Sequence, residues 1–189
     1  MIRLGVLGST KGTDLEPIIG AINQKTLKAK VVVILSNNSK AYILKRAAHY
    51  NIPSYFISTK NKSRINFDSE ITEVLEKYNV DLILLIGFMR VLSSNFCKKW
   101  TKKIINVHPS LLPKYAGGMD TNVHEEVLKN KDTTTGCTIH FVTEDLDAGP
   151  ILIQKTCSVK KNDSVNSLKE RVQKLEGDAF IQAIQMLSW

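Results

Sequence analysis

Short, near-continuous runs of apolar and β-branched residues constrain the fold of this chain more than any other feature. Runs of this kind are typical of parallel strands that are buried on both faces. Stretches with helical periodicity separate them. The alternation of strand and helix predicts an α/β fold with a doubly wound, mostly parallel sheet. The predicted strands span residues 2–7, 30–35, 82–86 and 104–107, and the predicted helices between them span 13–22, 41–50 and 67–78.

The second half of the chain continues this pattern. Strands are expected over residues 138–142 and 151–154, and a helix over 121–129. A long amphipathic helix is expected over 164–187, because Val165, Leu168 and Val172 follow three- and four-residue spacing. No linker or low-complexity segment interrupts the chain. We therefore expect one domain, 1–189, with a Rossmann-like sheet and a long C-terminal helix.

Composition excludes several classes of protein. Of 189 residues, 43% are hydrophobic and 23% charged, as in ordinary globular enzymes. The longest apolar runs are too short to span a bilayer, and no signal or transit peptide is visible. Three cysteines without CxxC spacing argue against a disulfide framework and a zinc site. The expectation is a cytoplasmic protein with no membrane partner and no metal.

The formal net charge of +8 suits an anionic partner. The densest basic segment, residues 98–103, is typical of a solvated helix end. No zinc-finger, RNP or basic-zipper pattern accompanies it. An anionic small molecule is therefore favoured over nucleic acid.

The segment Asn106-Val107-His108-Pro109 places an amide and an imidazole two residues apart at the end of a predicted strand. Alternation along a strand puts both on one face, and ligands of α/β sheets bind at strand ends. A histidine can exchange protons near neutrality, and an asparagine amide can stabilise a developing oxyanion. Asp147, in the loop that follows a later strand, offers the carboxylate that His108 needs as a partner. Because no GxSxG-type nucleophile is present, direct transfer between two bound substrates is favoured.

A second candidate is the loop of residues 8–14, Gly-Ser-Thr-Lys-Gly-Thr-Asp, before the first helix. Glycine permits close backbone approach, and a helix N-terminus attracts anions, so a phosphate would fit here. A tight strand-to-helix turn without a ligand explains the loop equally well. Thr13 and Glu16 match a capping box. His140 is expected to be a half-buried structural histidine, and His124 a surface or packing residue.

Together these residues resemble the phosphoribosylglycinamide formyltransferase family of folate-dependent enzymes. Nearly the whole chain is covered, and the matching segments occur in the family's order. They are Gly87-Phe88-Met89-Arg90-Val91-Leu92, residues 106–115, residues 136–142 and Leu146-Asp147-Ala148-Gly149-Pro150-Ile151.

The resemblance implies formyl transfer from 10-formyl-tetrahydrofolate to the amine of 5-phosphoribosyl-glycinamide, in de novo purine biosynthesis. His108 would be the general acid/base, Asp147 its partner, and Asn106 the oxyanion donor. In that family the N-terminal part binds the phosphate substrate, and residues 81–150 bind folate and carry the chemistry. The acceptor-binding residues would be Gly12, Thr13, Asp14, Pro109 and Glu176. The folate-binding residues would be Arg64, Met89, Arg90, Val91 and Leu92, together with Asn106.

Departures from the family pattern lie on the acceptor side. The family usually has Asn where Asp14 stands and His where Gly177 stands, and Lys11 is a further difference. The segment 117–124, which contains Asp120, favours the glycinamide ribonucleotide acceptor. The alternatives are a related folate-dependent formyltransferase that acts on a sugar-nucleotide or methionyl-tRNA amine, and a non-catalytic binding module. The enzyme is expected to be a monomer or homodimer.

Overall fold

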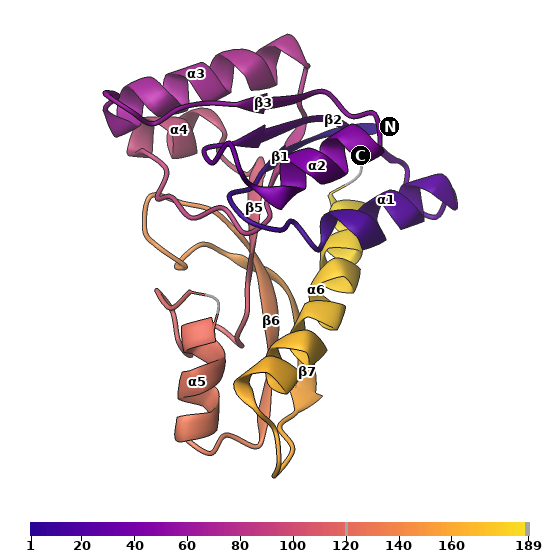
Figure 1. The fold of residues 1–189 in the computed structure, drawn as a ribbon, viewed down its shortest axis with the longest axis vertical. Helices are drawn as coiled ribbons and strands as arrows, with labels where there is room; N and C mark the ends of the chain where they lie inside the picture. The colour runs from indigo at the N-terminus through magenta and orange to yellow at the C-terminus, as the bar shows by residue number, and fades with distance from the viewer. Residues whose placement is uncertain (120, 188–189) are drawn as a thin grey trace.

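The computed structural model describes residues 1–119 and 121–187, which form one α/β domain around a seven-stranded sheet (Figure 1). The strand order is β3-β2-β1-β4-β5-β6-β7. The strands are β1 (Ile2–Leu7), β2 (Ala29–Ser36), β3 (Ser54–Phe56), β4 (Leu82–Leu85), β5 (Ile104–His108), β6 (Thr134–Phe141) and β7 (Ile151–Ser158). The helices are α1 (Leu15–Asn23), α2 (Tyr42–His49), α3 (Arg64–Lys77), α4 (Ser94–Lys99), α5 (Thr121–Lys129) and α6 (Val165–Met186).

The predicted doubly wound, mostly parallel sheet and long C-terminal helix are confirmed. Strands β3, β2, β1, β4 and β5 pair in parallel, and β6 and β7 join the β5 edge in antiparallel pairs. Every residue of β4 is buried, as expected for a strand covered on both faces. Residues of β7 alternate between exposed and half-buried, because β7 is an edge strand.

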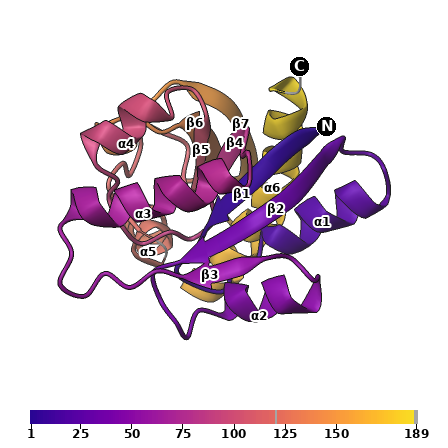
Figure 2. The same cartoon turned by 90° about the horizontal axis from the view of Figure 1, so that it is seen from above.

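Two apolar cores lie on opposite faces of the sheet. Side chains of α1, α2 and α6 build one core, and side chains of α3 and α4 build the other. Figure 2 shows α3 and α4 on one side of β1 and β2, with α1 and α6 on the other. Helix α5 packs against α6, beside β6 and β7. No helix in the described ranges is long and apolar enough to cross a membrane.

The local predictions differ from the structure in several places. The capping box of Thr13 and Glu16 is wrong, because the N-cap of α1 lies one residue later, at Asp14, and no side-chain cap bond is present there. Glu16 instead pairs with Arg46 of α2. Strand β3 and helix α4 were not predicted, since three partly exposed residues and a six-residue helix carry too short a periodic signal.

Gly136 allows β6 and β7 to approach closely. A Cβ added at Gly136 would lie 1.8 Å from the backbone oxygen of Lys155 on β7. We expect Gly136→Ala to lower the free energy of unfolding in urea by about 2–4 kcal/mol, because backbone cannot move aside as a flexible side chain can. The control is Gly20→Ala in α1, where no atom lies within 4 Å. That variant should gain about 0.5–1 kcal/mol, and equal effects of the two would contradict the prediction.

Candidate functional site

The predicted site residues meet where the parallel strands end and β6 crosses them. Asn106 and His108 lie on β5, and the antiparallel register pairs Asn106 with His140 of β6. The loop between β6 and β7 brings Asp147 to the same place. The predicted trio of Asn106, His108 and Asp147 is therefore one cluster.

His108 is held between two acceptors. Its Nδ1 lies 3.3 Å from Asp147 Oδ2, and its Nε2 lies 3.0 Å from the backbone oxygen of Tyr115. The side chains of His108 and Asp147 are only 4% and 8% exposed. A carboxylate and a carbonyl only accept hydrogen bonds, so His108 donates to both when its ring is the imidazolium. Asp147 also accepts a hydrogen bond of 2.8 Å from the backbone N–H of Gly117.

The loop that carries Tyr115 is anchored on its far side. The Tyr115 hydroxyl donates to Asp132 Oδ2 over 2.9 Å, and Lys114 Nζ contacts both oxygens of Asp132 at 2.9 and 3.0 Å. Tyr115 itself has φ +59°, in the left-handed region that bulky residues rarely adopt. Asp147 has φ +52°. Both residues that contact the His108 ring therefore have a left-handed backbone, which indicates that the surrounding structure holds the two partners of His108 in place.

His140 belongs to the cluster; it is hydrogen-bonded, as expected, but it is fully buried rather than half-buried. It is 2% exposed, and its Nδ1 donates to the backbone oxygen of Phe141 over 2.9 Å. Burial lowers the pKa of His140, although the Phe141 carbonyl and Asp147 oppose the effect. The neutral ring therefore accepts at Nε2, 3.2 Å from Asn106 Nδ2. This bond fixes the amide of Asn106 and leaves its second N–H without a partner among the described residues.

A cavity of about 80 Å³ opens beside the cluster. Asn106, His140 and Asp147 line it, with three of the residues predicted to bind folate: Arg90, Val91 and Leu92. The guanidinium of Arg90 stacks 4.7 Å from the Phe67 ring centre. Its Nε is buried without a hydrogen-bond partner, so a polar ligand atom would satisfy it.

Two of the predicted folate-binding residues lie elsewhere. Arg64 is exposed at the first position of α3 and lines neither this cavity nor the next. Met89 is 43% exposed and lines the neighbouring cavity. Within this segment Met89 lines the larger cavity, whereas Arg90, Val91 and Leu92 line the smaller one, a division that a sequence motif does not reveal.

The second cavity, of about 340 Å³, collects all five residues predicted to bind the acceptor. The turn at Gly12 has φ +64°, and a Cβ there would lie 2.4 Å from Ile43, so the close approach of this loop to α2 requires glycine. His124 is 1% exposed, so of its two expected roles it is a packing rather than a surface residue, and it also lines this cavity. Asp120 lies outside the described residues. The acceptor residues are Gly12, Thr13, Asp14, Pro109 and Glu176, and Lys11, Lys169 and Gln173 line the same cavity.

The segment of residues 106–109 separates the two cavities. Asn106 lines the smaller one, whereas Val107 and Pro109 line the larger one. His108 lines neither, because it is 3% exposed and its Nε2 faces the Tyr115 carbonyl. A group bound in each cavity would therefore meet at the end of β5.

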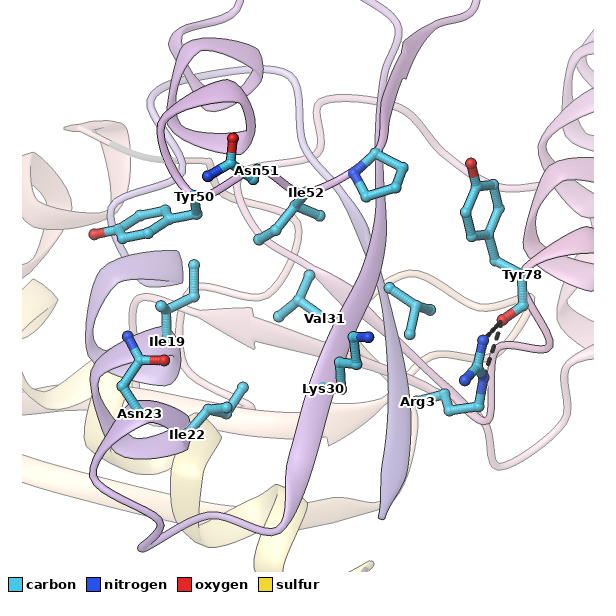
Figure 3. Close-up of a pocket in the computed structure, with 12 residues that line it drawn as sticks. Arg3, Ile19, Ile22, Asn23, Lys30, Val31, Tyr50, Asn51, Ile52 and Tyr78 are labelled. Carbon is cyan, nitrogen blue, oxygen red and sulfur yellow. Dashed lines mark hydrogen bonds between the residues drawn. The ribbon is translucent and has the colours of Figure 1, made fainter.

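A further cavity, of about 560 Å³, is remote from this chemistry (Figure 3). It lies at the amino ends of β1 and β2, against α1 and the residues that follow α2. Arg3, one of its two cationic residues, donates to the backbone oxygen of Tyr78. Among the described residues that line it there is no histidine, cysteine or carboxylate.

Comparisons with known proteins place these features in a family. Residues 2–184 match the formyl transferase family. The chain is 42% identical over 98% of its length to the trifunctional purine biosynthetic protein adenosine-3 of Bos taurus, but it spans only 18% of that protein. It is 37% identical to the phosphoribosylglycinamide formyltransferase of Escherichia coli, over 93% of this chain and 82% of that one. The crystal structure of glycinamide ribonucleotide transformylase 1 from Symbiobacterium toebii superposes with a TM-score of 0.92 at 34% identity, over 97% and 86% of the two chains.

Proposed function

The chain belongs to the formyl transferase family, and on this premise we propose that it transfers the formyl group of 10-formyl-tetrahydrofolate to the amino group of 5-phosphoribosyl-glycinamide. One observation carries the proposal. The Asn106, His108 and Asp147 cluster stands at the boundary between two cavities, one lined by acceptor residues and one by donor residues. Such a boundary suits direct transfer between two bound substrates.

The smaller cavity would receive the folate. Its apolar wall of Val91 and Leu92 suits a flat ring, and the unpaired Nε of Arg90 suits a polar edge of that ring. Its volume of about 80 Å³ is far below the roughly 300–1,000 Å³ of ordinary ligand sites. Binding must therefore displace its outer wall, the exposed segment 143–146. When bound, the folate supplies the formyl group at its reactive nitrogen.

The residues of the cluster divide the remaining work. Asn106 directs its free N–H toward the oxygen of the formyl group, on which negative charge grows as the acceptor nitrogen bonds to the formyl carbon. His108 exchanges its Tyr115 partner for the reacting atoms and supplies a proton. Asp147 holds the ring of His108 in place. In the balance of the reaction, one N–C bond forms, one breaks, and one proton moves from the acceptor amine to the departing nitrogen.

Different parts of the chain take different roles in this proposal. The N-terminal loop and α6 hold the acceptor together with Pro109, and the rest of the segment 81–150 holds the donor and carries the cluster. The partners are small anionic molecules rather than nucleic acid or a membrane, and a net charge of +8 favours their approach. We infer a cytoplasmic enzyme that works as a monomer or homodimer, without a metal.

One assay tests the function. The purified protein is incubated with 10-formyl-tetrahydrofolate and one amine at a time, and release of tetrahydrofolate is followed. Turnover with 5-phosphoribosyl-glycinamide is expected. Turnover only with a sugar-nucleotide amine or with methionyl-tRNA would move the protein to a related formyltransferase activity. No turnover with any amine would reject an enzymatic role.

His140 gives a further prediction for the same assay. We expect His140→Leu to lower kcat by about 10–100-fold with a smaller change in KM, because the Asn106 amide loses the acceptor that orients it, a loss of roughly 1–3 kcal/mol. The exposed His49→Leu is the matched control and should keep the kcat of the unmodified protein. An unchanged kcat in His140→Leu would show that Asn106 does not depend on this bond.

A further inference from the structure

Asp14 is an unusual carboxyl group for a cavity that is to receive a phosphate. It is 4% exposed and lines the larger cavity at the N-terminus of α1. Its side chain makes no cap bond to the helix and no hydrogen bond to any other described residue. Because Asp14 lines the cavity, its carboxyl group faces any ligand that occupies this space.

The surroundings of Asp14 decide its protonation. A helix N-terminus favours an anion, but burial has the larger effect and raises the pKa of Asp14 to about 7. The cavity also contains the cations Lys11 and Lys169, the carboxyl of Glu176 and the imidazole of His124. On β6, Cys137 lies close enough for Glu176 and Asp14 to add to the burial that raises its pKa to about 12. Near neutrality Asp14 therefore exists in both forms.

We propose that Asp14 determines acceptor specificity by donating its carboxylic O–H to a phosphate oxygen of the acceptor, so that binding of the phosphorylated acceptor takes up one proton. This inference rests on the proposed function and names the Asp14 carboxyl as the group that recognises the phosphate of the acceptor. A carboxylate has no hydrogen to donate, whereas a neutral carboxylic acid has one. A phosphate monoester carries about −1.5 to −2 charges at pH 7, so it repels the charged form of Asp14 and pairs with the neutral form.

The sign of the pH dependence follows directly. Below pH 7 most Asp14 is neutral and binds phosphate, and above pH 7 the neutral fraction falls about tenfold for each pH unit. Acceptor affinity should fall in the same proportion. An asparagine at this position donates an N–H at every pH and has nearly the same shape.

Isothermal titration calorimetry of wild type and Asp14→Asn tests the proposal, with 5-phosphoribosyl-glycinamide as the titrant. Titrations at pH 6–9, in buffers of different ionisation enthalpy, give both Kd and the number of protons taken up. At pH 8, wild type should take up close to one more proton than Asp14→Asn. Its Kd should rise about tenfold per pH unit above 7, while that of the variant rises much less. The second ionisation of the phosphate is common to both titrations and cancels in the comparison.

The dephosphorylated glycinamide riboside provides a second measurement that needs no variant. Its affinity for wild type should lack the tenfold fall per pH unit, because no phosphate meets Asp14. Binding of the phosphorylated acceptor with the same pH profile and proton uptake in wild type and Asp14→Asn would overturn the role of Asp14 and leave the proposed function intact. Absence of both binding and turnover with this acceptor would overturn the two together.

Discussion

Replacement of His108 by alanine should lower kcat for formyl transfer by about 10²–10⁴-fold, the range that a positioned acid or base contributes. In the proposed mechanism the imidazole is the proton donor, and it lies on β5 between Asp147 and the Tyr115 carbonyl. KM values for both substrates should change much less, because His108 lines neither cavity. The measurement is release of tetrahydrofolate under saturating substrates.

Folding must be separated from chemistry in this experiment, because His108 is 3% exposed and its loss leaves a small void. Thermal unfolding of the variant should show one cooperative transition above the assay temperature. The exposed His49→Ala serves as the control for a histidine outside the site. A folded His108→Ala protein with kcat within threefold of wild type would refute the acid/base role and favour a non-catalytic binding module.

Asp147→Asn should be the second most damaging change, with kcat lowered by about 10²–10³-fold and little loss of stability. The amide has the shape of the carboxylate and can still accept the backbone N–H of Gly117 through its oxygen. It loses the negative charge that faces His108 Nδ1 at 3.3 Å, so the imidazolium loses its charged partner. The chemistry therefore suffers while the loop keeps its anchor.

The neighbouring Asp145→Asn is the matched control for Asp147→Asn. Asp145 is exposed in the same loop and lines the smaller cavity, and its replacement removes the same charge while it leaves the His108–Asp147 pair in place. It should keep a kcat close to that of wild type. Equal losses in the two variants would mean that the loop's overall charge, rather than the His108 contact, supports turnover.

The elements with strong local periodicity were predictable from the sequence. Strands β1, β2, β4 and β5 can be recognised in the sequence as nearly continuous apolar runs, because a strand covered on both faces has apolar side chains on both faces. Helix α6 is recognisable in the same way, from apolar residues that recur at three- and four-residue spacing along it. Strand β3 and helix α4 were missed because both are short. Strand β3 is held by its pairing with β2, and helix α4 is stabilised by the N-cap at Ser93.

Acceptor residues from the N-terminal loop, β5 and α6 were named from a family resemblance, and the structure gathers them around one cavity. The position of Met89 on the acceptor side and of Arg64 outside both cavities could not be predicted in the same way. A motif states which residues follow one another, whereas the direction of each side chain depends on backbone angles and on packing against other elements.

The sequence by itself determined the α/β class and the candidate residues at the end of β5, because hydrophobic periodicity and residue type are properties of neighbours along the chain. Only the tertiary structure decided that His140 orients Asn106 and that Asp14 lies buried in the wall of the larger cavity. The His140 contact depends on the antiparallel register of β5 and β6, which brings together residues 34 positions apart. The state of Asp14 depends on how much water α1, α5 and α6 exclude together, and no local pattern encodes that.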